Sequence, residues 1–177
     1  MTRHSIITSI ISIALVSGCT NDESPSTTVL EHETDPITTV DLNLLPAFNS
    51  HSVISIDKST NTVQFRVDTT IKYYHQGNVG VFSTSLDSFR ANAPVDSFYS
   101  QTFLDSVKSK PNRSVVRDGL SIFTVIKRGN ISDTIESGNV YPKILSSNII
   151  LQLDYIFKTT KDKELKKYLK DLKEYFH

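Results

Sequence analysis

Apolar and polar residues alternate in the middle of the chain, and this pattern predicts β-strands. Within residues 62–68, Val63, Phe65 and Val67 lie between polar neighbours, which is the period of a strand with one buried face. A short apolar run at 53–56 precedes this strand, and turn-forming residues separate the two. We interpret 71–74 as an extension and 79–86 as the return strand, since the intervening residues include a Gly-Asn pair.

A second pair of strands is predicted further along the chain. Residues 120–126 are rich in Ile, Val, Phe and Thr, and residues 131–135 follow after a short break. Arg128-Gly129-Asn130 in that break is typical of a hairpin turn. We therefore expect 120–126 and 131–135 to pair as antiparallel strands.

A helix is predicted between the two pairs of strands. Apolar residues recur there at three- and four-residue steps, at Val95, Phe98, Tyr99, Phe103 and Val107. Pro94 suits the first position of a helix, and Pro111 suits the end of one. The spacing predicts one helix over about 94–109.

Residues 141–157 fit two patterns. Alternating apolar residues from Ile149 to Phe157 would suit a strand, but the wider segment also has apolar residues at helical spacing. Pro142 fits a helix start, and the segment is longer than an ordinary strand. We predict a helix, with a strand as the alternative.

The last segment carries one apolar stripe, formed by Leu165, Tyr168, Leu169, Leu172, Tyr175 and Phe176. Thr160 is the expected cap, and Asp162 suits the positive first turn of a helix. A lone helix of about 16 residues is marginal in water, so the stripe indicates a helix packed on the core. It does not favour a free arm that binds a membrane or a partner.

These elements together predict an α+β fold. We expect an antiparallel sheet of about four to five strands, made of two hairpins with an intervening helix, packed against C-terminal helices. The expected domain covers residues 48–177 as a single globular unit, which is long enough to bury one core.

The N-terminal residues have the three parts of a secretory signal. Arg3 precedes a short apolar run, and small residues then lead to Cys19, the only cysteine. The run spans about 11 residues, whereas a membrane-spanning helix needs about 20. Val16-Ser17-Gly18-Cys19 resembles the lipobox of bacterial lipoproteins.

That resemblance implies cleavage between Gly18 and Cys19 and acyl chains, palmitate among them, on Cys19. Residues 1–18 would then be a signal peptide, and the protein would be held on the membrane through this lipid anchor. By the same resemblance, Thr20 after the cysteine favours the outer over the inner membrane of the cell envelope.

Residues 19–47 are expected to form a flexible acidic tether. From Thr20 to about Asp41 the chain has six carboxylates and no Lys or Arg, with few apolar residues. Such a composition cannot bury enough apolar surface to offset its ordering entropy. The change of pattern near Phe48 sets the expected start of the domain.

Composition limits the chemistry. The formal net charge is zero, so no overall field indicates nucleic-acid binding. A single cysteine excludes an internal disulfide and cysteine-based zinc sites. No histidine pair has metal-ligand spacing and no nucleophile or phosphate-loop motif is present, so we expect no metal and no cofactor.

Three residues remain as a candidate surface: Tyr73, Tyr74 and His75, in and before a predicted turn. Tyr is common at binding sites. Two classes of function follow. The first is a non-enzymatic binding or accessory module with a protein partner, of the immunity or complex-subunit type. The second is a small envelope hydrolase that uses His75 with sequence-distant carboxylates.

Overall fold

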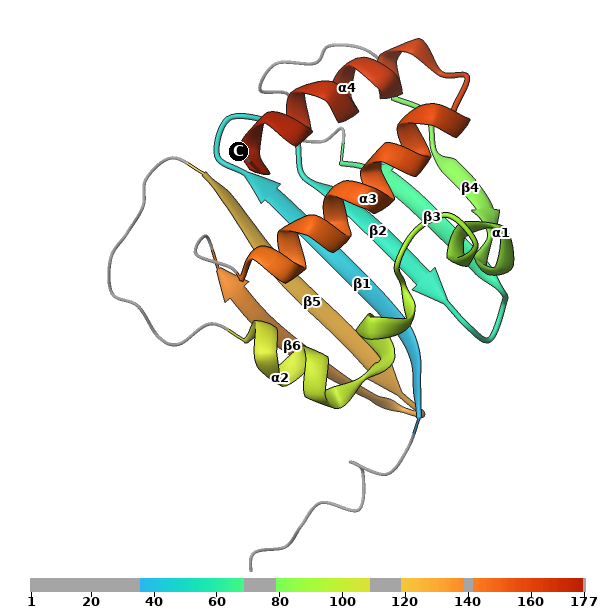
Figure 1. The fold of residues 1–177 in the computed structure, drawn as a ribbon, viewed down its shortest axis with the longest axis vertical. Helices are drawn as coiled ribbons and strands as arrows, with labels where there is room; N and C mark the ends of the chain where they lie inside the picture. Colours follow the sequence, from blue (N-terminus) through green and yellow to red (C-terminus); the bar gives the residue numbers. More distant parts are fainter. Residues whose placement is uncertain (1–35, 69–78, 109–118, 139–141, 177) are drawn as a thin grey trace, which may run out of the picture. The chain divides into compact units, whose positions relative to one another are not determined.

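The fold is α+β, as the sequence predicts. The computed structural model describes residues 36–68, 79–108, 119–138 and 142–176. All the described elements belong to one compact unit, His32–His177. Figure 1 shows the strands side by side in one sheet, with the labelled helices lying over one of its faces.

The sheet has six antiparallel strands in the order β4-β3-β2-β1-β5-β6. Their bounds are β1 Ile37–Pro46, β2 Ser52–Asp57, β3 Thr62–Val67, β4 Phe82–Ser85, β5 Leu120–Arg128 and β6 Ile131–Gly138. The predicted strands at 53–56, 62–68, 120–126 and 131–135 are confirmed. The predicted return strand is shorter than expected because Ser85 caps a helix: its hydroxyl accepts a hydrogen bond from the Ser88 amide.

The expected boundary of the domain at residue 48 is wrong. Strand β1, Ile37–Pro46, falls within the segment that we expected to be tether, and it lies in the sheet between β2 and β5. It joins the two predicted hairpins into one sheet. Val40, Leu42 and Leu44 are fully buried and alternate with Asp41 and Asn43, so the strand period is present within an acidic stretch.

The prediction of a single helix over 94–109 is also wrong. The structure has α1 at Leu86–Arg90, a 3-10 helix η2 at Asp96–Tyr99 and α2 at Gln101–Val107. Ser100 adopts an extended conformation with φ −100° and ψ 121°, which ends η2 before α2 begins. Phe98, Leu104 and Val107 are fully buried, so the apolar positions reach the core as predicted although the helix is broken.

Of the two patterns that the segment after Pro142 fits, helix and strand, the structure has the helix. Helix α3 covers Lys143–Thr159, and its buried residues are Leu145, Ile149, Gln152, Leu153 and Ile156. These positions share one side of a helix, whereas a strand would have buried every second residue. The alternation at the end of this segment was therefore coincidental.

The C-terminal helix packs on the core, as predicted. Helix α4 covers Lys163–Lys173 and continues into η3 at Glu174–Phe176. Its side chains Leu165, Tyr168, Leu169 and Leu172 are at most 1% exposed. Asp162 caps the helix, not Thr160: its carboxylate accepts hydrogen bonds from the amides of Glu164 and Leu165.

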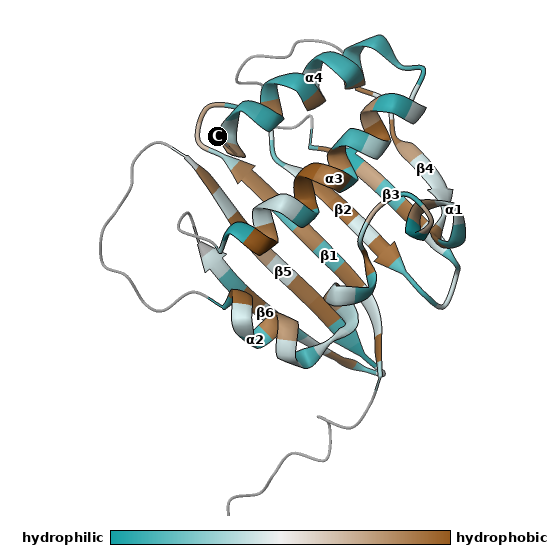
Figure 2. Ribbon diagram, viewed as in Figure 1, coloured by the Kyte–Doolittle hydropathy of each residue, from teal (hydrophilic) through white to brown (hydrophobic). Residues whose placement is uncertain are grey.

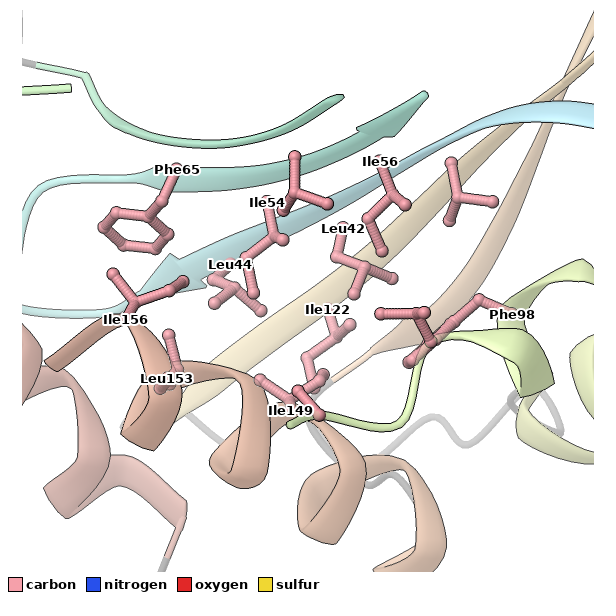
Figure 3. Close-up of a cluster of buried hydrophobic side chains, with 14 of the residues drawn as sticks. Leu42, Leu44, Ile54, Ile56, Phe65, Phe98, Ile122, Ile149, Leu153 and Ile156 are labelled. Carbon is pink, nitrogen blue, oxygen red and sulfur yellow. The ribbon is translucent and has the colours of Figure 1, made fainter. Parts of the chain in front are cut away.

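The core lies between the sheet and the helices. Figure 3 shows strand residues such as Leu42, Ile54 and Ile122 pointing toward Ile149 and Leu153 of α3. Tyr168 of α4 completes this layer: its ring lies 6.2 Å from that of Phe65, and its hydroxyl donates to the Ser50 carbonyl at 2.5 Å. That hydrogen bond satisfies a fully buried hydroxyl and ties α4 to the start of β2.

Candidate functional site

The residues singled out in the sequence lie outside the described residues. This applies to Gly18 and Cys19 of the expected lipidation site and to Tyr73, Tyr74 and His75 of the expected binding surface. The structure therefore does not bring them together or separate them. His51, directly before β2, is the histidine that falls within the described part of the chain.

Residues 36–68, 79–108, 119–138 and 142–176 hold no group of three His, Cys, Asp or Glu side chains placed to bind a metal ion. Within the same ranges, no helix combines the length and the apolar character needed to cross a membrane.

A polar cluster joins the β2–β3 turn to the helices α1 and η2. The Lys58 ammonium lies 3.6 Å from the centre of the Tyr99 ring, and the Tyr99 hydroxyl donates to the Ile56 carbonyl at 3.4 Å. Arg90 pairs with Asp96 at 2.9 Å, and the Asn61 amide donates to Asp87 at 3.0 Å. These contacts hold the α1–η2 segment against the end of the sheet.

The electrostatics of this cluster indicate a structural role. Burial raises the pKa of the Tyr99 phenol well above its usual range, although the nearby Arg90 charge opposes the shift. The phenol therefore stays protonated at neutral pH and cannot serve as a base. The cluster connects the β2–β3 turn to α1 and η2.

The second candidate site is the face of the sheet opposite the helices, where side chains from several strands lie next to one another. On this side the strands present residues that are at least partly exposed, whereas the helix side is almost fully buried. Figure 1 places the labelled helices over the other face. We define the open face by the outward residues Thr39, Asp41, Asn43, Leu45, Val53, Ser55, Gln64, Arg66, Ser121, Phe123, Val125, Lys127, Thr134 and Glu136.

Cross-strand register sets the layout of the open face. One row runs from Arg66 on β3 through Val53, Asn43 and Phe123 to Glu136 on β6. Directly opposite residues on one face have Cβ atoms about 5 Å apart, so Val53 and Phe123 flank Asn43 closely. The Asn43 amide donates to the carbonyls of Asp41 and Phe123, both at 3.3 Å, so it lies along the sheet.

Apolar side chains adjoin one another on the β1–β5 part of the open face. Phe123 and Val125 project from β5, Leu45 projects from the neighbouring β1, and each is partly exposed. Polar and charged residues lie next to them, among them Asp41 and Glu136. An apolar patch with polar neighbours is a layout found at protein interfaces.

The dimensions of the open face also suit an interface. The five strands that contribute to it, with about 4.8 Å between neighbours, span about 19 Å, and seven residues along a strand span about 24 Å. A surface of that size has an area of several hundred Å², about half of the roughly 800 Å² that each partner buries in a standard complex.

Sequence reasoning missed the open face, although a signal for it is present in β5. Leu120, Ile122 and Ile126 face the core in one phase, and Phe123 and Val125 are apolar in the opposite phase. A strand that is apolar in both phases indicates two contact surfaces. The composition of 120–126 predicts a strand, but it does not separate the two sides of that strand.

Comparison with known proteins found no match: no family model, no curated protein and no solved structure is similar to this chain at a significant level.

Proposed function

We propose that this chain is a lipid-anchored cell-envelope protein that binds another protein through the open face of its sheet. Two different parts of the chain support this. The Val16-Ser17-Gly18-Cys19 sequence supports the anchor, and the open face supports the binding role. The proposal covers both an immunity-type protein and a subunit of an envelope complex.

The single observation that carries the binding role is Phe123. It is a large, partly exposed aromatic residue on the side of β5 that faces away from the helices, and it lies opposite Asn43 of β1 and Glu136 of the edge strand β6. Aromatic residues are enriched at the centres of interfaces, where they contribute much of the binding energy. A sheet that needed only solubility would carry polar residues at this position.

Affinity capture from detergent-solubilised envelope extracts tests the binding role with the wild type and the Phe123→Lys variant. Lysine is chosen because Glu136 lies opposite, so a cross-strand ion pair supports the fold. The matched control is Phe48→Lys, which makes the same change at a 52% exposed phenylalanine outside the open face. Circular dichroism checks that both variants keep the wild-type fold.

We expect a specific partner to be retained by the wild type and by Phe48→Lys and to be lost from Phe123→Lys. Truncation of a central aromatic residue commonly costs 2 kcal/mol or more of binding energy, about thirtyfold in affinity. Equal retention by both variants would show that the open face is not the binding surface.

A further inference from the structure

The outer surface of helices α3 and α4 combines lysines with exposed apolar side chains. In α4 the leucines and Tyr168 face the sheet, so the lysines face outward. Lys163, Lys167 and Lys170 are exposed and lie at steps of four and three residues, which places them in one row. Figure 2 shows α4 as mostly hydrophilic on the side that faces the viewer.

The lysines of this layer outnumber its carboxylates. Residues 143–176 contain eight lysines, five Asp or Glu residues and no arginine, whereas the whole chain is balanced at 19 of each sign. Asp154 and Asp162 are among the carboxylates that are engaged in the fold. Asp154 pairs with Lys173 at 2.7 Å, and Asp162 accepts hydrogen bonds from backbone amides. The helix layer therefore carries an excess of positive charge, balanced elsewhere in the chain.

Two large apolar side chains lie on the same layer. Ile144 is 55% exposed and Leu151 is 49% exposed. They are seven residues apart on α3, so they project from the same side of the helix. The Lys173–Asp154 pair joins α4 to α3. The basic row and the apolar pair both lie away from the buried residues of their helices, so both belong to the outer side of this helix pair.

We propose that this outer surface of α3 and α4 docks on a bilayer that contains anionic phospholipid. Lysines near such a surface are attracted by its negative potential, and exposed apolar side chains enter the headgroup region. The use of lysine without arginine favours a lipid over an acidic protein, because protein interfaces are enriched in arginine and depleted in lysine.

The docking builds on the proposed anchor and orients the domain. An acyl group on Cys19 would keep the domain close to the bilayer, so a weak attraction suffices to hold one side against it. The helix layer and the open face lie on opposite sides of the sheet. Docking through the helices therefore turns the open face away from the membrane and toward a protein partner.

Vesicle co-sedimentation tests the docking with a chain of residues 19–177 that carries Ser at position 19. Among the described residues the whole core lies between Ile37 and Leu172, so this chain keeps every core contact. Because it has no acyl chain, the result is independent of whether Cys19 is lipidated. The probes are vesicles of phosphatidylcholine with phosphatidylglycerol and vesicles of phosphatidylcholine alone.

Two variants with equal loss of charge are compared. The test variant is Lys163→Gln, Lys167→Gln, Lys170→Gln. The matched control is Lys108→Gln, Lys110→Gln, Arg113→Gln, which removes three positive charges from sequence positions outside both the helix layer and the open face. The melting temperature of each variant confirms that it is folded.

We expect the wild type and the control to bind only the anionic vesicles, with affinity that falls as salt is added. The test variant should bind about a hundredfold more weakly, because each lysine near an anionic surface contributes about 1 kcal/mol. Equal losses in both variants, or equal binding to both kinds of vesicle, would overturn the proposal. Binding to soluble polyglutamate without binding to vesicles would also overturn it and would assign the surface to an acidic polypeptide.

Discussion

Replacement of Gly80 by alanine tests a contact between the start of the β4 segment and the cap of α4. The Gly80 amide donates to Oδ2 of Asp162 at 2.9 Å, and Oδ1 of the same carboxylate accepts from the amides of Glu164 and Leu165. A Cβ atom on Gly80 would overlap Oδ2 of Asp162. The carboxylate would therefore have to move.

The expected cost follows from the hydrogen bonds that this movement breaks. A hydrogen bond to a charged group contributes about 1.5–3 kcal/mol, and loss of an N-cap costs about 0.5–2 kcal/mol. Gly80 does not have a positive φ, so alanine itself adds no backbone strain and gains about 0.4–1 kcal/mol from reduced chain entropy. We expect Gly80→Ala to lower the free energy of unfolding by about 1–3 kcal/mol.

The assay is urea denaturation of four chains: the wild type, Gly80→Ala, Asp162→Ala and the double variant. If the carboxylate is the obstacle, Gly80→Ala should cost little or should stabilise when Asp162 is already alanine. The coupling energy of this cycle should then exceed about 1 kcal/mol. An equal cost of Gly80→Ala in both backgrounds would refute the contact as the cause.

Three further outcomes are expected. Hydrogen bonds from the amides, that of Leu165 above all, lower the pKa of Asp162, so its contribution to stability is complete above about pH 4 and is lost as the pH falls through the lower folded-state pKa. The difference in unfolding free energy between the wild type and Asp162→Asn should therefore narrow below about pH 4, and a constant difference would contradict this. Leu169→Ala should cost about 2–5 kcal/mol, a fall in melting temperature of about 6–20 °C, because the side chain is fully buried, whereas Leu151→Ala on the exposed side of α3 should leave the melt nearly unchanged. Metabolic labelling with a fatty acid should tag the wild type and not Cys19→Ser, and equal labelling of both would argue against lipidation.

The sequence alone determined the elements whose pattern is local. The period of β2, β3, β5 and β6 and the buried stripe of α4 could be predicted because each depends on residues within one or two turns or strand repeats. The side of α3 that meets the sheet followed from the same spacing, once its length was weighed against that of a strand. Apolar residues that recur with the period of a strand or helix predict which side of it is buried, because removing apolar surface from water is favourable.

Tertiary structure decided the position of β1 and therefore the start of the domain. Val40, Leu42 and Leu44 alternate as in any strand, but the acidic residues around them have the composition of a tether. A register shift between Ile37 and Thr39 also interrupts the period. Whether such a stretch is ordered depends on hydrogen bonds to β2 and β5, and β5 lies about 80 residues away in the chain.

The candidate surfaces depend on the same long-range pairing. Phe123 becomes part of an open face only because β1 and β6 lie on either side of it and the labelled helices cover the opposite side. The Gly80–Asp162 contact joins residues 82 positions apart. A local pattern fixes which side of a strand or helix is apolar, but it does not fix which other segment will cover that side or leave it exposed.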